Sequence, residues 1–430
     1  MKKLRMISII VIIIIAIVWN KQIIDSKQEI SSLELVKVMG MDYVYMEDKD
    51  YSEENSLNNI NLGENTEGKK NSKNMESQIS LLINSNVHST PQVGKEVTNN
   101  QKGEVFSFRG ITFNSALGKT QTYMQKSIPG SHIQYLILGN DMTSIGVSKA
   151  VDFISRSSET RLNARVYAVE DKTAKEFLEC VIQDSIEVDH KLSSMEQKTE
   201  FPRQYLPVEV MDILEAEEKE EAYVIPRLKI AKEKESINDV KLNKDDKLQE
   251  NLNYFDFSGY RVMFKNKKIV DLDLRQSLVY NMLINKSKGI MIDIVQGNDT
   301  ISFGVINSSC KYEFEFDENN IPIKVNIKIN VKSNIDEDDT SEEIFDIDVI
   351  EKYEKKQEKI LTSKLKEVIK IYKDNKVDFI KLEEKFKIRY PYKYRKIEKK
   401  FDEIIDNMEI ELKVNCNIMR TYDVIMTNKN

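Results

Sequence analysis

Histidine and cysteine are the residues of this chain whose side chains most readily bind metals or act as nucleophiles. The histidines are His88, His132 and His190, and the cysteines are Cys180, Cys310 and Cys416. No HExxH, HxH or CxxC spacing occurs, so the sequence offers neither a zinc site nor a dithiol redox motif, and we expect no cofactor and no metal. His132 precedes an apolar segment, where we expect a hydrogen-bonded structural histidine, and Cys416 has the phase of a buried strand residue.

Other catalytic patterns are also missing from the sequence. It contains no GxSxG, no GxGxxG and no complete Walker motif, since Phe113 stands where the first glycine before Gly118, Lys119 and Thr120 should be. Acidic runs such as 215–221 and 336–339 lie in solvated stretches, whereas a catalytic carboxylate pair needs two different environments. We therefore predict a protein that is not an enzyme.

The charge of the chain bears on its partners. The formal net charge is −7, and three of the 64 basic residues precede the first apolar run, so the rest of the chain is more acidic still. Binding to a phosphate backbone needs a basic face, and acids are interleaved with bases even in the most basic stretch, 381–400. Nucleic acid is therefore not an expected partner.

The N-terminus carries an apolar run, MISIIVIIIIAIVW, from Met6 to Trp19. As a helix it extends about 21 Å, against about 30 Å for a bilayer core, so it is short for a span and needs a thin bilayer or snorkelling bases. Bases before the run place that end in the cytoplasm, and no small-x-small cleavage site follows. An uncleaved anchor is our prediction, with a cleaved signal peptide as the alternative. The anchor residues are Met6, Ile9, Ile10, Val11, Ile12, Ile13, Ile14, Ile15, Ile17, Val18 and Trp19.

With 430 residues, the chain predicts two or three domains after an anchor or signal-like segment at 1–20. Residues 21–185 alternate apolar strands with helices and predict a mixed α/β domain, with a polar, flexible stretch at 47–73. Residues 186–254 are rich in Glu and Lys and predict a charged middle domain or linker. In it the proline of AYVIPRLKI favours an edge strand or a loop.

Residues 255–430 predict a C-terminal α+β domain. The segment 321–331 alternates strictly and places Ile321 and Ile323 on one apolar face with the residues that follow, and 410–418 alternates again. Between them, 350–372 has the spacing of a long amphipathic helix, flanked by two antiparallel-type strands. The fold class is therefore α+β: an N-terminal anchor, then two or three mixed α/β domains with antiparallel-rich sheets and a long amphipathic helix in the last domain.

Several local patterns together resemble the Ger(x)C family of spore germination proteins, the C subunits of germinant receptors. They are a strand ending in Gly-x-Asp, the block HIQYLILGNDMTSIGVSKAVDFISRSSETRLNARVYAV, and the C-terminal VDF, RYP, FDE and Arg-Thr motifs. The positions singled out as structural or partner-contact candidates are Gly40, Asp42, His132, Gly139, Arg156, Arg161, Pro391 and Arg420. Val18 stands where the family usually has a lipobox cysteine, so the apolar run has to anchor the protein unless it is cleaved.

The resemblance implies a non-enzymatic receptor subunit of three mixed α/β domains on the outer face of the spore inner membrane. It implies assembly with A and B subunits to enable germination, and direct germinant binding is not expected. A membrane-anchored extracytoplasmic solute-binding protein is the alternative, and a cell-wall hydrolase is a third, weaker one. For Arg156 and Arg161 we expect local pairing with Glu159 at a helix end, with contact to a partner subunit as the other interpretation.

Overall fold

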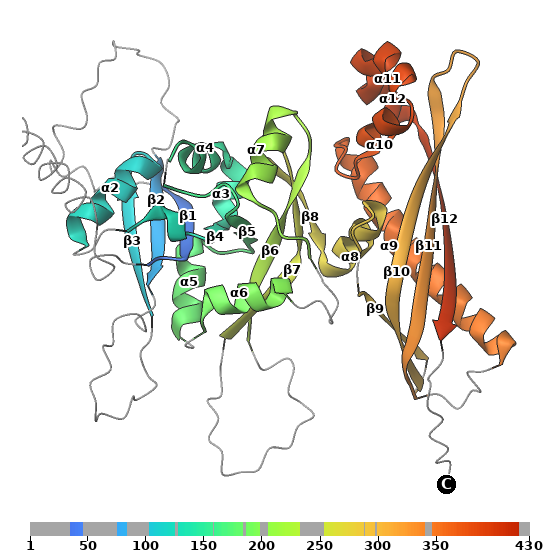
Figure 1. Ribbon diagram of the computed structural model, residues 1–430, viewed down its shortest axis with the longest axis horizontal. Helices are drawn as coiled ribbons and strands as arrows, with labels where there is room; N and C mark the ends of the chain where they lie inside the picture. Colours follow the sequence, from blue (N-terminus) through green and yellow to red (C-terminus); the bar gives the residue numbers. More distant parts are fainter. Residues whose placement is uncertain are drawn as a thin grey trace, which may run out of the picture.

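An eight-stranded sheet and a four-stranded sheet organise the chain into two lobes (Figure 1). The structure is a computed structural model that describes residues 35–45, 75–83, 103–124, 128–157, 159–183, 186–197, 205–232, 253–287, 289–296, 299–339 and 346–420. The expected anchor and the expected flexible stretch at 47–73 lie outside these ranges. Within them, no helix combines the length and the hydropathy that a bilayer span requires.

The first sheet has parallel strands in its middle and antiparallel pairs on both sides. Across the sheet the strands are β3 (Glu104–Gly110), β2 (Met75–Ile83), β1 (Val38–Tyr45), β4 (Tyr135–Leu138), β5 (Arg165–Val169), β6 (Tyr223–Lys232), β7 (Asn253–Phe264) and β8 (Lys267–Asp273). The helices of this lobe are α2 (Phe113–Tyr123), α3 (Asn140–Ile145), α4 (Ser148–Arg156), α5 (Ala174–Gln183), α6 (Val188–Gln197) and α7 (Val210–Glu218).

Helices cover both faces of the first sheet, and this explains its continuous apolar strands. All four residues of β4 are buried: Leu136 and Leu138 pack with α2, α3, α4 and α7, whereas Tyr135 and Ile137 pack with α5 and α6. The core on the α5 side continues through α8 (Leu274–Leu283) into the second sheet. The two lobes therefore share one apolar core.

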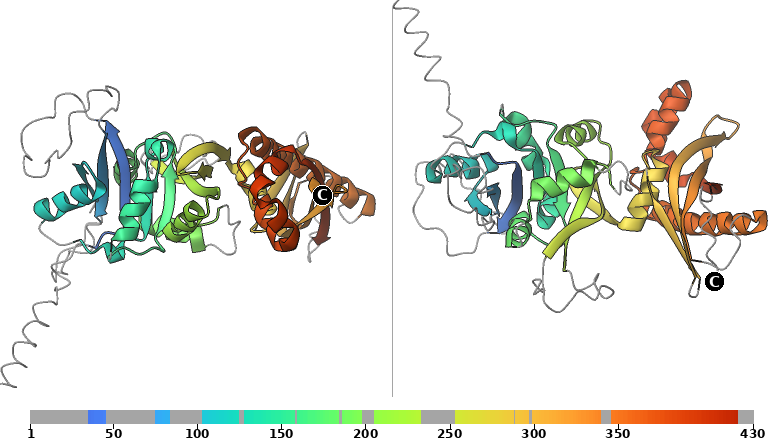
Figure 2. Two further views of the ribbon diagram at one scale, coloured as in Figure 1. Left: turned by 90° about the horizontal axis from the view of Figure 1, so that it is seen from above. Right: turned by 60° about the horizontal axis from the view of Figure 1, so that its bottom comes forward.

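The sheet runs across the boundary that we expected at residues 254 and 255. The region 186–254 supplies α6, α7 and β6, and β6 pairs with β7 along its whole length. β7 and β8 form a hairpin that turns at Lys265 and Asn266, both of which have positive φ. Figure 2 shows this hairpin and α8 leading from the first lobe into the second.

The expectation that proline places AYVIPRLKI at an edge or in a loop is wrong. Pro226 lies inside β6, which has β5 on one side and β7 on the other. Pairing with β5 begins only at Arg227, because the first half of β5 is occupied elsewhere: the Val166 N–H donates to the Val208 carbonyl. Proline, which has no backbone N–H, is tolerated at position 226 because no carbonyl of β5 is paired with this residue.

The second sheet has the order β12 (Glu409–Arg420), β11 (Pro322–Asp338), β10 (Asp299–Phe316) and β9 (Met291–Gln296). Between β11 and β12 the chain forms α9 (Ile347–Asn375), α10 (Leu382–Arg389), α11 (Pro391–Ile397), a short 3-10 turn at Glu398–Lys400 and α12 (Phe401–Asn407). The predicted long helix is confirmed as α9. The strands on either side of it pair in parallel, so the expected antiparallel arrangement of these two is wrong. A helical crossover returns a chain to the same end of a sheet, and the next strand then runs in the same direction.

Strict alternation over 321–331 is correct only from Val325 onward. Lys324 and Pro322 pair with the adjacent residues Glu315 and Phe316, so Ile323 is the extra residue of a β-bulge. Its side chain is 52% exposed, whereas Val325 is fully buried. Periodicity cannot reveal a bulge, because the apolar residue type is the same in both positions.

The free edge of β12 is covered by two glutamates of α9. Glu358 accepts a hydrogen bond from the Cys416 N–H at 3.0 Å, and Glu354 accepts one from the Ile418 N–H at 2.8 Å. Residues four apart on a helix are about 6 Å apart, close to the spacing of alternate strand residues. The helix thus satisfies N–H groups that an edge strand otherwise offers to another chain.

Replacing both Glu354 and Glu358 with alanine is expected to lower the free energy of unfolding by about 2–4 kcal/mol, because two charge-assisted hydrogen bonds are lost. The opened edge is also expected to promote association between molecules, measured by light scattering alongside a denaturant titration. Glu351→Ala, on an exposed position of the same helix, is the matched control. A double variant that stays monodisperse and as stable as this control would show that the edge needs no cover.

Candidate functional site

The carboxyl ends of β1 and β4 bring together three of the residues singled out from the sequence. After β1 the chain turns to β2 on one side, and after β4 it continues toward β5 on the other. In open α/β sheets ligands bind outside the strand ends at such a divergence. Gly40, Asp42 and Gly139 lie here, next to the N-terminus of α5.

The side chain of Asp42, on β1, caps the N-terminus of α5. Its Oδ1 accepts a hydrogen bond from the Ala174 N–H at 2.7 Å, and its Oδ2 accepts one from the Lys175 N–H at 3.0 Å. Thr173 and Glu176 satisfy each other's N–H groups in a capping box. The first N–H groups of α5, which could otherwise hold an anion, are therefore used by the protein itself.

Two glycines give Asp42 the room to reach α5. A Cβ on Gly139 would lie 2.0 Å from Asp42 Oδ1, and a Cβ on Gly40 would lie 3.0 Å from the Ala174 Cβ. Both glycines are thus required for close packing of β1, β4 and α5. The three positions form a structural cluster that fixes α5 on the sheet.

Burial raises the pKa of Asp42 to about 6, against the lowering effect of its two backbone donors. A carboxyl whose pKa is higher in the folded than in the unfolded state binds its proton more tightly when folded. Stability is therefore gained as the pH falls from above 6 toward 4. Between pH 7.5 and 4.5 we expect the wild type to gain about 2 kcal/mol relative to Asp42→Asn, which cannot titrate.

Urea titrations of both proteins across this pH range measure the difference. Asp152→Asn, which removes an exposed carboxyl on α4, serves as control. If the free energies of unfolding of the wild type and Asp42→Asn differ by the same amount at every pH, the raised pKa of Asp42 is contradicted.

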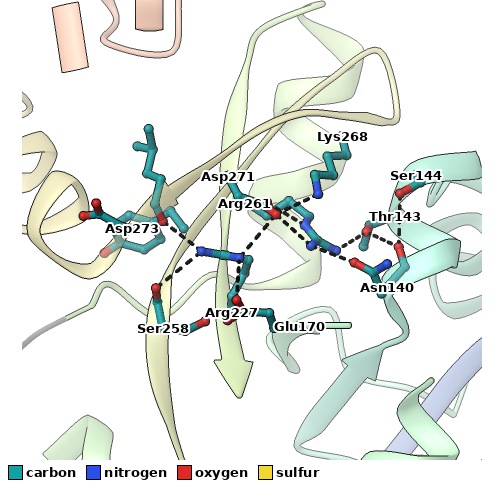
Figure 3. A network of polar contacts seen from close by, with 12 residues as sticks. Asn140, Thr143, Ser144, Glu170, Arg227, Ser258, Arg261, Lys268, Asp271 and Asp273 are labelled. Carbon is teal, nitrogen blue, oxygen red and sulfur yellow. Dashed lines mark hydrogen bonds and ion pairs between the residues drawn. The ribbon is translucent and has the colours of Figure 1, made fainter. Parts of the chain in front are cut away.

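Next to this cluster lies a network of charged side chains centred on Arg261 of β7 (Figure 3). Arg261 is 1% exposed and contacts Asp271, its direct partner on β8, through Nε at 2.8 Å and through a terminal nitrogen at 3.0 Å. The same guanidinium donates to Thr143 Oγ1 at 2.5 Å and to Asn140 Oδ1 at 2.9 Å, both on α3. One arginine therefore ties the β7–β8 hairpin to the helix that follows β4.

Arg227 of β6 extends the network. Its terminal nitrogens lie 3.2 Å from Asp271 Oδ2 and 3.7 Å from Glu170 Oε1, and it donates to the Leu272 carbonyl at 3.1 Å. Ser258 is the extra residue of a bulge in β7 opposite Arg227, and its carbonyl accepts a further, longer bond at 3.4 Å. The bulge turns backbone carbonyls toward the buried cation.

Asp271 is held as a carboxylate by its neighbours. Burial pushes its pKa upward, but the hydrogen bonds from Arg261 and Lys268 outweigh burial, and the pKa lies below its usual value. Each charge in the network faces an opposite one, and the network contains no nucleophile. The network holds the β7–β8 hairpin, which leads into the second lobe, against α3 and β6.

The other residues predicted from the sequence lie elsewhere. His132 is exposed, in the short 3-10 turn Gly130–His132 at the opposite end of β4, so the expectation of a structural histidine beside the buried strand is wrong. Pro391 is exposed and begins α11, and Arg420 ends β12. These three are not brought together with the cluster around Asp42.

The expected pairing of Arg156 and Arg161 with Glu159 is also wrong. Arg156 contacts Asp152, one turn earlier on α4, at 2.7 Å. Glu159 instead accepts a hydrogen bond from the Gly130 N–H at 3.5 Å. Both arginines are exposed.

Sequence reasoning missed the arginine network and the role of Asp378. Asp378, the middle residue of the VDF motif, accepts hydrogen bonds from the Leu382 and Glu383 N–H groups and caps α10 as Asp42 caps α5. Among the described residues, no group of three or more His, Cys, Asp or Glu is arranged to hold a metal ion. Cys180, Cys310 and Cys416 are free thiols, and Cys416 is buried as expected.

Two sheets that share one core, with helix ends capped by buried aspartates, define an α+β protein of two lobes. The family model described as "Spore germination protein N-terminal domain" matches residues 26–230. The model described as "Spore germination B3/ GerAC like, C-terminal" matches residues 258–422. The chain belongs to the Ger(x)C family of spore germination proteins.

The crystal structure of the GerBC protein has the same fold. It superposes with a TM-score of 0.52 over 81% of this chain and 95% of the GerBC chain, at 14% sequence identity. No curated protein matches the chain. One family match ends within β6 and the other begins within β7, so both contribute strands to the first sheet.

Proposed function

We propose that this chain is the non-enzymatic C subunit of a nutrient germinant receptor and assembles with A and B subunits at the outer face of the spore inner membrane. The observation that carries the proposal is the match of both family models, in order, across most of the chain. The fold shared with GerBC supports it. In this proposal Met6 to Trp19 anchor the protein, and the germinant is sensed by other subunits.

The polar clusters support a scaffolding role. Asp42 fills the place at the strand ends where an open sheet usually receives a ligand, and each charged group around Arg261 has an oppositely charged neighbour. A subunit of this kind acts through its surface. Arg156 and Arg161 are the candidates for a charged contact, because both are exposed on the first lobe.

The proposal is tested by recovering tagged, full-length protein from spore inner membranes and identifying by mass spectrometry what co-purifies. Recovery of A-type and B-type subunits, with slower or lost germination to a nutrient when the gene is deleted in a strain without paralogues, is the expected result. Intact membrane complexes that contain neither subunit, or unaltered germination, would refute the proposal.

The same recovery with Arg156→Ala and Arg161→Ala combined tests the contact. Exposed ion pairs contribute little to stability, so the variant is expected to fold normally. Loss of the A and B subunits from a folded variant would assign the contact to these arginines. Unchanged recovery would remove them from the interface.

A further inference from the structure

The end of the second lobe carries a concentration of positive charge that the rest of the molecule lacks. Of the sixteen residues 385–400, eight are basic and one is acidic, in a chain whose net charge is −7. We call these residues, which span the end of α10, α11 and the following 3-10 turn, the basic tip. In Figure 1 α11 and α12 lie at one extremity of this lobe, with α10 beside them.

Aromatic packing fixes the tip on the sheet. Phe386 of α10 contacts Phe314 of β10 and Phe401 of α12, each with ring centroids 5.1 Å apart or less. Tyr390 packs edge-on against Phe316 at 5.1 Å. The apolar side of α10 and α11 is thereby buried against β10, and the basic side faces outward.

The bases of this outward side outnumber the exposed acids around them, Glu384, Glu398, Asp402 and Glu403, and two further acids already have partners. Glu383 accepts a hydrogen bond from the Tyr394 hydroxyl at 2.5 Å, and Glu313 of β10 pairs with Lys328 at 2.6 Å. Most bases of the tip are exposed: Lys387, Arg389, Arg395, Lys396, Lys399 and Lys400. The positive field is therefore presented to the surroundings of the molecule.

Two apolar side chains protrude among these bases. Tyr392 is 79% exposed and Ile388 is 69% exposed, although the tip buries its other large apolar groups well. Exposed apolar groups ringed by Lys and Arg are typical of surfaces that lie in a bilayer interface, where bases meet lipid phosphates and a tyrosine inserts its ring. Each base near an anionic leaflet adds roughly a factor of five in affinity.

We infer that the basic tip docks on a membrane surface rich in anionic lipid headgroups, with Tyr392 and Ile388 entering the interface. A membrane fits better than an acidic protein because the apolar groups protrude and the bases are spread over successive turns. This contact goes beyond the proposed receptor assembly and beyond the N-terminal anchor. The second lobe would then contact the bilayer directly, at a site separate from the N-terminal anchor.

The test uses the full-length chain in vesicles that contain no other protein, so its outcome is independent of receptor assembly. Trp19 is the only tryptophan, so Trp19→Phe combined with Tyr392→Trp places a single reporter in the tip. Its emission and its quenching by brominated acyl chains are compared in phosphatidylcholine vesicles and in vesicles with added phosphatidylglycerol. We expect a blue shift and quenching only with phosphatidylglycerol, reversed in 0.5 M salt because the charges are then screened.

Matched charge reversals distinguish an effect of the basic tip from an effect of the net charge of the protein. Arg395→Glu, Lys396→Glu and Lys399→Glu are expected to reduce quenching to the phosphatidylcholine level. Lys359→Glu, Lys366→Glu and Lys370→Glu, three exposed positions on α9, change the net charge equally and are expected to leave quenching intact. Circular dichroism confirms folding, and the lipid and salt comparisons hold for the reporter protein whether or not a reversal folds.

An emission spectrum that is the same with and without phosphatidylglycerol would overturn the inference, as would an equal loss of quenching in both triple variants. A tip that stays out of vesicles, but whose reversal strips a protein from complexes recovered from spores, would also overturn it and assign the surface to an acidic protein.

Discussion

Replacing Arg261 with methionine is expected to lower the free energy of unfolding by about 3–5 kcal/mol. The guanidinium is 1% exposed and makes two contacts with Asp271 and one each with Thr143 and Asn140. Methionine fills much of the volume but leaves these acceptors without their donor. Asp271 keeps Lys268 and Arg227, which holds the loss below that of a fully isolated buried charge.

The pH dependence identifies the cause of the loss. The pKa of Asp271 lies below its usual value in the folded protein, so its ion pairs contribute stability above about pH 4, and this contribution is lost as the pH falls through the folded pKa. The difference in the free energy of unfolding between the wild type and Arg261→Met is therefore expected to become smaller in acid. Denaturant titrations at pH 7 and at about pH 2.5, well below the usual pKa of an aspartate, measure this difference in the free energy of unfolding.

A matched variant and a double-mutant cycle complete this test. Arg156→Met removes an arginine whose ion pair with Asp152 is exposed, and it is expected to cost about 0.5 kcal/mol or less. Adding Asp271→Leu to Arg261→Met is expected to recover part of the loss, because the second change removes the carboxylate that the first leaves without its main partner. Additive effects of the two changes would show that Arg261 does not stabilise the fold through Asp271.

Elements with a strong local period could be predicted from the sequence. The long helix α9 contains the expected 350–372. This helix has one apolar face over its length, so neighbouring residues suffice to define it.

Features set by pairing between distant strands could not be predicted in this way. The parallel direction of β12 depends on the whole crossover from β11, and the position of Pro226 depends on which segment occupies β5. Ile323 is exposed because of a single extra residue in the ladder. None of these features can be recognised from the residue types of the local sequence.

The candidate site shows the same division. The Gly-x-Asp pattern pointed to Asp42, but its role depends on α5, whose capped N–H groups lie 132 and 133 residues further along the chain. Arg227 and Arg261 lie in strands, where charged residues usually face solvent, so neighbouring residues did not indicate that these two are buried. Only the fold brings their carboxylate partners close enough to make burial tolerable.

Gly139→Ala is expected to destabilise the protein by about 3–5 kcal/mol, through sterics and not through backbone strain. Gly139 has φ −63° and ψ 156°, which alanine adopts readily. Its Cβ would, however, lie 2.0 Å from Asp42 Oδ1 and 3.2 Å from the Ala174 nitrogen. Asp42 then has to move away and release the two N–H groups of α5, each hydrogen bond to a charged group being worth about 1.5–3 kcal/mol.

The glycine at 118 provides the control, because a Cβ there meets nothing within 4 Å and the residue lies inside α2. Gly118→Ala is expected to stabilise the protein by about 0.5–1 kcal/mol through helix propensity. In an Asp42→Ala background the obstacle to a methyl group at 139 is gone, so Gly139→Ala is expected to cost far less than in the wild type. If Gly139→Ala costs the same in both backgrounds, its effect does not pass through Asp42, and the cap of α5 is not what this glycine protects.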